Sequence, residues 1–374
     1  MLLTDLDQNY KRQSFLYRSG CRLLYNGVQV RGECRQNAAR SLRMKTIIDI
    51  ARAAGVAKST VSRYLNGGSV SEETREKIER IIKQHNYVPN TFAQSLKAKK
   101  TSIIGTIVPR LDSFAVSQTL MGIDEELRGR QYQLLISSAN QDMNREIEEI
   151  YALARQKISG LLLLASQITE QHLKAIRECR IPAVMIGQQH SLLHSVVHDD
   201  FHASYMMGQH ILNKGHRRIA YLGVTEQDIA VGVMRKEGFR KALDEYKDCE
   251  VRYYESGFRM NEAVAAAERL LEDWMPTIIV CATDNIALGV MKAAFLKQIP
   301  IPSGLSVTGF GGYDITEIIH PALTTVKYHY KRAGKLAAEN IISLVNREPV
   351  EMVTILNCEI IGRESVDNLQ GRII

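Results

Sequence analysis

The chain has 374 residues, of which 45% are hydrophobic and 24% are charged, and its formal net charge is +7. This ordinary globular composition excludes collagen-like, low-complexity and wholly disordered chains, and at roughly 150 residues per domain the length predicts two or three domains. No apolar run approaches the roughly 20 residues that span a bilayer, so no membrane segment is expected. The six cysteines form no CxxC pair. A disulfide scaffold or zinc site is therefore not expected, whereas a reducing, cytoplasmic location is.

The positive charge is concentrated towards the amino terminus. Residues 1–43 carry eight Lys/Arg and three Asp/Glu, and residues 44–100 carry eleven and five, which leaves 29 basic and 33 acidic residues for the rest. This asymmetry favours a polyanion-binding head on a mildly acidic globular body. Residues 1–43 show no sustained helical or strand period, so they are expected to be a disordered basic arm or the product of a misassigned start before Met44. We assign the DNA-binding domain to residues 45–88.

The head is predicted to be a bundle of short helices. Thr46 can cap a first helix over 47–54, Gly55 breaks that helix, and a second helix follows over 58–65. A third helix is expected to open at Ser71. Two helices joined by a short turn that contains glycine are typical of a helix-turn-helix, although any three-helix bundle is the plainer alternative.

The second helix has a face suited to DNA. Val61 and Leu65 are expected to point inward, and the narrow helix can enter the major groove. Its free face contains hydrogen-bonding and cationic groups and no acid, which favours nucleic acid over the plain bundle. The residues of that face are Lys58, Ser59, Ser62 and Arg63.

Several motifs of the head carry a family resemblance. They are Asp49-Ile-Ala, Ala54-Gly-Val, Ser59-Thr-Val-Ser-Arg63, Leu65-Asn66, Val70-Ser71, Thr74-Arg75, Tyr87-Val-Pro-Asn90 and Ala93-Gln-Ser-Leu96. In this order and spacing they closely resemble the head of the lactose/galactose repressor family. The resemblance implies that Lys58 and Ser59 begin a recognition helix and read bases, while Thr60, Ser62 and Arg63 contact bases or phosphates.

The same resemblance implies a hinge helix and linker over residues 89–100. Asn90 would open the hinge helix, and Ala93 and Leu96 would enter the minor groove, where Leu96 unstacks a base step. For Leu96, packing in a core is the alternative. Ala57 stands where the family usually has serine, so one phosphate or cap hydrogen bond is expected to be missing.

From Thr101 onward, buried strands alternate with amphipathic helices, which predicts parallel sheets covered on both faces. About 270 residues of this pattern indicate two doubly wound lobes with a cleft between them, and ligands bind such sheets outside the carboxyl ends of the strands. The predicted strands are 103–108, 134–137, 160–164, 183–186, 219–222, 278–281 and 305–308.

The body also resembles the effector domain of this family, whose lobes are similar to periplasmic sugar-binding proteins. The matching motifs are Arg235-Lys-Glu-Gly-Phe239, Thr283-Asp284-Asn-Ile-Ala287, Ser306-Val-Thr-Gly-Phe310 and Pro321-Ala-Leu-Thr-Thr-Val326. The fold class that follows is an all-α helix-turn-helix head with a hinge helix, then an α/β periplasmic-binding-protein-like body of two parallel-sheet lobes. The expected division gives the first lobe 101–199 and 325–347, the second lobe 200–324 and 348–365, and a tail 366–374.

The resemblance implies an effector site around Arg235, whose planar fork suits paired sugar hydroxyls or a phosphate. The alternative for Arg235 is a surface ion pair with Glu237 or Asp228. Phe258 would stack on the ligand, with a core position as its alternative. The remaining candidates are Asp112, Ser113 and Phe114 after the first strand, Gln188 after the fifth strand, and Thr283 with Asp284, where Asp284 is either a helix cap or a ligand residue.

One departure from the family concerns Gly309-Phe-Gly-Gly-Tyr-Asp314, because many members have an acid directly after Gly-Phe. Asp314 or Tyr313 is expected to substitute, or the pocket has a different shape. This run, with Pro109-Arg-Leu-Asp-Ser-Phe114 and Val196-Val-His-Asp-Asp200, most resembles the sucrose-operon repressors of Gram-positive bacteria. It implies a homodimeric repressor that sucrose, or a fructose-containing or phosphorylated relative, releases from operator DNA without a cofactor.

Two rival functions remain open. An enzyme on doubly wound sheets is disfavoured, because the chain has no GxGxxG after a strand, GxxxxGK[ST], HExxH or GxSxG motif. A metal site at His190, His194, His198 and His202 is also disfavoured, because 191–197 is predicted to be a loop. The other rival is a catabolite-control regulator of the same family, driven by a phosphorylated protein that contacts the first lobe.

Overall fold

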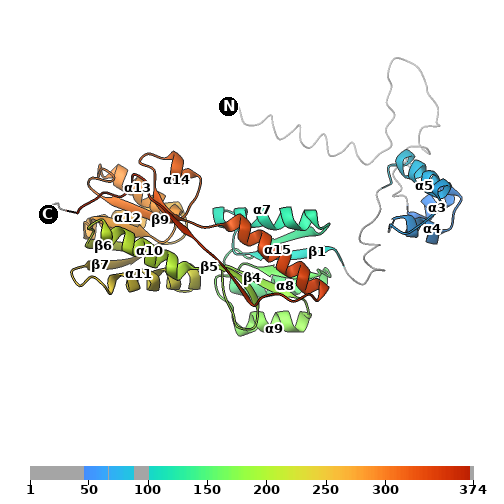
Figure 1. The fold of residues 1–374 in the computed structure, drawn as a ribbon, viewed down its shortest axis with the longest axis horizontal. Helices are drawn as coiled ribbons and strands as arrows, with labels where there is room; N and C mark the ends of the chain where they lie inside the picture. The colour runs from blue at the N-terminus through green and yellow to red at the C-terminus, as the bar shows by residue number, and fades with distance from the viewer. Residues whose placement is uncertain (1–45, 66, 88–100, 371–374) are drawn as a thin grey trace, which may run out of the picture. The chain divides into compact units, whose positions relative to one another are not determined.

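The computed structural model describes residues 46–65, 67–87 and 101–370. They belong to two compact units, a head and a body, which divide between Thr91 and Phe92. Figure 1 shows the elements of both units. The predicted arm (1–43) and the whole of the predicted hinge helix and linker (89–100) lie outside the described residues.

In the described part of the head, three helices surround a small core: α3 (Ile47–Ala54), α4 (Lys58–Leu65) and α5 (Glu72–Gln84). Ile50, Val61 and Ile78 are fully buried where the three helices meet. The predicted bounds of the first two helices are confirmed, as is the start of the third after Ser71.

Local hydrogen bonds explain the first helix and the turn after it. The Thr46 hydroxyl accepts from the backbone N–H of Asp49, and the Asp49 carboxylate accepts from the N–H of Thr46 at 2.8 Å. This capping box satisfies donors that a helix start leaves free. Gly55 ends α3 in the left-handed conformation (φ 66°), which glycine adopts without steric cost. The chain therefore turns sharply into α4.

The body contains two six-stranded sheets, one in each lobe. The strand order is β11-β5-β4-β3-β1-β2 in the first lobe and β12-β10-β9-β8-β6-β7 in the second. Every pairing is parallel except that of β12 with β10. The strands are β1 (Ile103–Val108), β2 (Gln133–Ser138), β3 (Gly160–Leu163), β4 (Ala183–Ile186), β5 (His194–His198), β6 (Arg218–Gly223), β7 (Glu250–Glu255), β8 (Ile278–Cys281), β9 (Ser306–Gly311), β10 (Thr324–Lys327), β11 (Val353–Leu356) and β12 (Glu359–Ile361).

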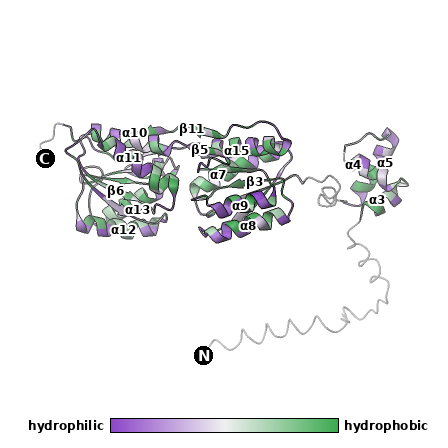
Figure 2. Cartoon of the chain, turned by 90° about the horizontal axis from the view of Figure 1, so that it is seen from below, coloured by the Kyte–Doolittle hydropathy of each residue, from purple (hydrophilic) through white to green (hydrophobic). Residues whose placement is uncertain are grey.

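Helices cover both faces of each sheet, which confirms the predicted doubly wound lobes. In the first lobe α7 and α15 pack on one face and α8 and α9 on the other, and in the second α10 and α11 oppose α12 and α13. Figure 2 shows the apolar strands between helices whose outer faces are hydrophilic. The helices are α7 (Phe114–Gly129), α8 (Met143–Arg155), α9 (Glu170–Cys179), α10 (Asp200–Asn213), π-helix η1 (Ile229–Met234), α11 (Arg235–Leu243), α12 (Met260–Asp273), α13 (Asp284–Leu296), α14 (Ile315–Ile318) and α15 (Tyr330–Asn346).

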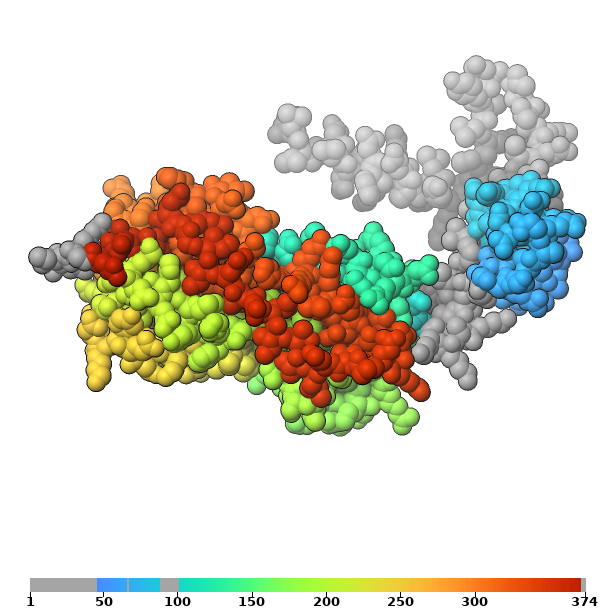
Figure 3. All heavy atoms as spheres, viewed as in Figure 1, coloured from blue at the N-terminus to red at the C-terminus, as the bar shows by residue number. Residues whose placement is uncertain are grey.

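The predicted lobe boundaries near the carboxyl terminus are wrong. Strand β10 pairs with β9, so 325–327 belong to the second lobe, and β11 pairs with β5, so 353–356 belong to the first. The chain thus crosses between the lobes after β5, after β10 and after β11. Both misplaced segments belong to four-residue strands, which are too short to indicate which sheet they join. Figure 3 shows the carboxyl-terminal residues, in red, lying on both lobes.

Three further expectations need correction. Residues 194–198 form strand β5 instead of part of a loop, because the histidines at both ends conceal a short apolar centre. Gln188 follows the fourth strand of the chain, β4, and not a fifth. The expected tail is packed up to residue 370: Val366 is buried in the second lobe, and the N–H of Asp367 donates to Ser306.

No helix in the described part of the chain is long and apolar enough to cross a membrane.

Candidate functional site

The first candidate site is the outer face of α4. Lys58, Ser59 and Arg63 are exposed, whereas Thr60 and Ser62 are half-buried. This face offers an ammonium group, a guanidinium group and hydroxyls, which can contact phosphates and base edges. The remaining predicted DNA contacts (Asn90, Ala93 and Leu96) lie outside the described residues.

The second candidate site is a cavity of about 180 Å³ between the two lobes of the body. Its wall comes from strand ends, loops and helix starts at the carboxyl ends of strands in both sheets, where ligands of doubly wound folds bind. Five of the eight predicted effector residues line it: Ser113, Gln188, Arg235, Phe258 and Thr283. Asp112, Phe114 and Asp284 lie outside the wall.

Arg235, the first residue of α11, is held rigidly at the cavity. It is 5% exposed, its Nε donates to Asp200 Oδ1 at 2.8 Å, and its Nη1 donates to the backbone oxygen of Ala282 at 2.6 Å. The guanidinium lies over the rings of Tyr328 and Phe310, 4.8 and 5.3 Å from their centroids. The surface ion pair offered as the alternative for Arg235 does not form, because its carboxylate partner is the buried Asp200.

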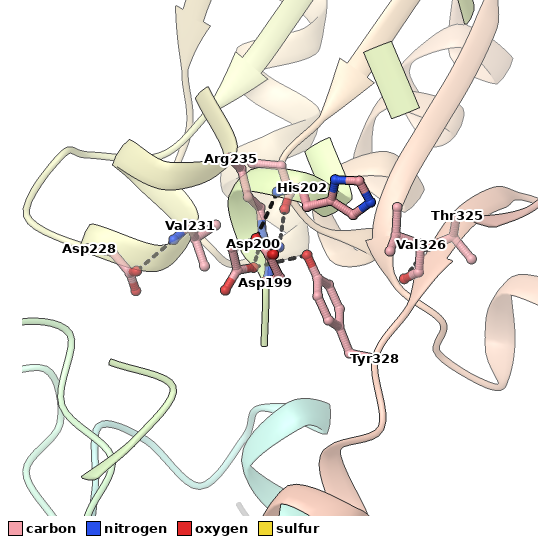
Figure 4. Close-up of polar contacts among 10 residues, drawn as sticks. Asp199, Asp200, His202, Asp228, Val231, Arg235, Thr325, Val326 and Tyr328 are labelled. Carbon is pink, nitrogen blue, oxygen red and sulfur yellow. Dashed lines mark hydrogen bonds and ion pairs between the residues drawn. The ribbon is translucent and has the colours of Figure 1, made fainter. Parts of the chain in front are cut away.

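Asp200 and Tyr328 are site residues that the sequence reasoning missed. Asp200 is 7% exposed, stands at the start of α10 just after the first crossover, and also accepts from the Tyr328 hydroxyl at 2.9 Å. Figure 4 shows Arg235 and Tyr328 meeting on Asp200 from separate segments of the chain. The sequence feature that could have pointed to Asp200 is the Val-Val-His-Asp-Asp run, in which two acids follow a short apolar strand.

His198 and Asp228 add polar groups to the wall. Burial lowers the pKa of His198 to about 4, so its imidazole is uncharged at neutral pH, and its buried Nε2 has no hydrogen-bond partner among the described residues. Asp228 accepts from the N–H of Val231 at 2.9 Å and caps η1, which runs directly into Arg235. Burial raises the pKa of Asp228. A π-helical turn at this point is consistent with a functional site.

Asp284 supports the wall from behind. It is fully buried and accepts from the N–H of Tyr313 at 2.9 Å and from the Thr325 hydroxyl at 2.5 Å, and burial raises its pKa to about 6. A Cβ on Gly311 would lie only 2.8 Å from an Asp284 oxygen, so glycine lets the loop wrap around the carboxylate. Thr283, not Asp284, caps α13 by accepting from the N–H of Ile286.

The aromatic side of the cavity is built by pairs of side chains. Tyr313 lines the wall and its ring centroid lies 4.4 Å from that of Phe114, whereas Asp314 is exposed. Tyr313 is therefore the one of the two expected substitutes that reaches the cavity. Across from it, the Arg110 guanidinium lies 5.1 Å from the Phe258 ring centroid and 3.6 Å from Asp112, which is half exposed.

The four histidines whose spacing raised the possibility of a metal site do not cluster in the structure. Across the part of the chain that the structure describes, no group of three or more His, Cys, Asp or Glu side chains is arranged to hold a metal ion. His194 instead contacts the backbone oxygen of Glu351 at 3.0 Å, and His198 packs edge-on against Tyr328 and Tyr330. Their four-residue spacing falls on a strand and its flanks, where it does not bring the rings together.

Two family models match the chain. The model of bacterial regulatory proteins, lacI family, matches residues 46–90, and that of a periplasmic binding protein-like domain matches residues 209–366. The first match ends at the junction of head and body, and the second begins within α10, so residues 91–208 lie in neither match.

Similar proteins match over most of the chain. The sucrose operon repressor of Staphylococcus xylosus is 38% identical over 317 residues, which cover 84% of this chain and 98% of that protein. Catabolite control protein A of Priestia megaterium is 28% identical, covering 82% of this chain and 94% of that protein. The structure of the lac repressor dimer bound to operator and the anti-inducer ONPF has a TM-score of 0.81, with 24% identity, 87% of this chain and 100% of that chain covered. The fold is thus shared with that structure.

Proposed function

Since this chain belongs to the lacI family of bacterial regulatory proteins, as the motifs of its head predicted, we propose that it represses a sucrose-utilisation operon and leaves the operator when sucrose or a fructose-containing relative fills the cavity. The relatives are transcription regulators, not enzymes. The observation that carries the proposal is one chain with an acid-free helix-turn-helix face and, in a separate unit, a polar and aromatic cavity between two lobes.

The wall of the cavity suits a carbohydrate ring. Phe258 and Tyr313 supply flat apolar surfaces, while Ser113 and Gln188 supply groups that can donate and accept hydrogen bonds. The guanidinium of Arg235 is already oriented by Asp200, so little side-chain entropy is lost when a ligand arrives. Phe114 and Asp284 act indirectly, because both hold Tyr313 in place.

Release from DNA follows from a shift between two arrangements of the lobes. An effector that contacts both lobes binds their closed arrangement better and therefore shifts the population towards it. A coupling free energy of 1–3 kcal/mol between the two sites corresponds to roughly 5–150-fold weaker operator binding. The head joins the body through the segment before β1, so the first lobe transmits the change to the hinge residues Asn90, Ala93 and Leu96.

The regulator acts in the cytoplasm as a homodimer in this proposal. Two heads read the halves of a near-palindromic operator, and paired hinge helices bend the duplex at its centre. The lac repressor of the similar structure is a dimer on operator DNA. The 38% identity with a sucrose operon repressor supports sucrose, or a relative that contains fructose, as the effector.

A release experiment tests this function. An operator is first selected from a random DNA library with the full chain, and sugars are then titrated into the labelled complex while fluorescence anisotropy is followed. Sucrose or fructose alone should release the DNA, whereas lactose should not. If sugars have no effect and a phosphorylated protein alters DNA binding, the chain is a catabolite-control regulator and the sucrose proposal fails.

A further inference from the structure

The charges and helix starts on the cavity wall select the chemical class of the effector. We infer that the cavity takes an uncharged carbohydrate and discriminates against its phosphate esters. This inference rests on the proposed function, because it concerns the same cavity and names the form of the sugar. It is carried by the pairing of the cations, the placement of the acids and the capping of the helix starts.

Both cations on the described wall already have carboxylate partners. Arg235 donates to Asp200 at 2.8 Å and to a backbone oxygen, so two of its three nitrogens are used. Arg110 lies 3.6 Å from Asp112 and stacks on Phe258. A phosphate ester carries close to two negative charges at neutral pH and needs cations that are not already neutralised. In its described part the wall provides only Arg110, whose partner Asp112 is exposed and also lies 3.9 Å from Arg259.

An acid on the wall opposes a phosphate further. Asp200 is neutralised by Arg235, whereas Asp228 lines the cavity without an ion-pair partner among the described residues, so its carboxylate repels an anion. The imidazole of His198 does not offset this charge, because its burial keeps it neutral. Asp228 can instead accept a hydrogen bond from a sugar hydroxyl, which an esterified phosphate oxygen cannot supply.

Helix starts are the usual phosphate-binding feature of such folds, because their free backbone N–H groups attract anions. Of the helices that begin at this wall, four already have a side chain that accepts from a backbone N–H, whereas α15, which begins at Tyr330, has no side-chain cap. Ser113 caps α7, Asp199 caps α10, Asp228 caps η1 and Thr283 caps α13, with acceptor-to-nitrogen distances of 3.5, 2.9, 2.9 and 3.3 Å. A phosphate would have to displace these caps.

What remains on the wall fits hydroxyl groups. The unpartnered Nε2 of His198, the buried amide of Gln188 and the side chain of Asn285 can each exchange hydrogen bonds with a hydroxyl, which both donates and accepts. Phe258 and Tyr330 add ring surfaces. An uncharged sugar can therefore satisfy these groups without leaving a charge unpaired.

Calorimetry of the full chain decides the inference. The ligands are sucrose and fructose, together with sucrose 6-phosphate, fructose 1-phosphate and fructose 6-phosphate. The three esters place the phosphate at different positions on the sugar. The unesterified sugar should bind at least tenfold more tightly than each of its esters. An ester that binds as tightly or more tightly, and releases operator DNA, overturns the inference and leaves the proposed sugar-responsive repressor intact. If no carbohydrate binds at all, the proposed function is wrong and the inference falls with it.

A variant identifies the charge responsible. Asp228→Asn removes the negative charge but keeps an oxygen that can accept from Val231 N–H, so the ratio of ester affinity to sugar affinity should rise several-fold, whatever the change in sugar affinity itself. The matched control is Asp314→Asn, an exposed acid off the wall, which should change neither. Equal affinity gains for sugar and ester would contradict the charge argument. In the unaltered protein, raising the salt concentration should reduce the difference in affinity between the sugar and its ester, because salt screens the repulsion of the phosphate. This checks the repulsion without a mutation.

Discussion

Replacing Arg235 with alanine should destabilise the second lobe as well as abolish the response to effector. The Arg235–Asp200 pair is 2.8 Å long and both side chains are almost fully buried. Removing one partner of such a pair costs about 3–5 kcal/mol, because it leaves an uncompensated buried charge. Operator binding should survive in the fraction that remains folded, since the head is a separate unit.

The free energy of unfolding can be measured from the fluorescence of Trp274, the single tryptophan of the chain, which is buried in the second lobe. The cycle of Arg235→Ala, Asp200→Ala and the double variant should be strongly non-additive, because the double variant leaves neither charge unpaired. The control, Glu237→Ala, breaks an exposed ion pair on the same helix and should cost less than about 1 kcal/mol. If Arg235→Ala costs no more than this control, or still gives normal induction, the assignment is wrong.

Three other predictions concern the hinge, the packing of the second lobe and its response to pH. Leu96→Ala should weaken binding to the selected operator far more than binding to random DNA in anisotropy titrations, and equal losses would remove the wedge role. Gly238→Ala should lower the unfolding free energy by about 1–3 kcal/mol in denaturant titrations, because its Cβ would clash with a carbonyl oxygen of α10; Gly129→Ala, which has open space around it, is the control. Asp284 has a pKa raised from 3.8 to about 6, so it binds protons more readily when the protein is folded, and the free energy of unfolding should fall by about 2 kcal/mol as pH rises from 4 to 6. Buried His198 acts in the opposite direction, so the difference between wild type and Asp284→Asn across this range is the quantity to measure, and a constant difference would contradict the pKa argument.

The helices of the head and most of the parallel strands were predictable, because each is encoded by a few adjacent residues. A capping threonine, a glycine turn and an apolar period specify α3 and α4 wherever the rest of the chain lies. Runs such as 160–164 and 278–281 are continuous apolar segments, which only a buried strand explains at that length. Two lobes then follow from the number of such segments.

Tertiary structure alone decided which groups meet in the cavity. Asp200 reaches Arg235 from 35 residues away, and Tyr328 joins them because β10, which it directly follows, pairs with β9 in the second sheet. Asp284 belongs to a recognisable motif, yet burial beneath the Gly311 loop turns it from an expected ligand contact into a support. Local sequence patterns predict periodicity and helix caps but not the order of strands in a sheet or the points where the chain crosses between lobes. These long-range features determine which groups pair with each other on the cavity wall.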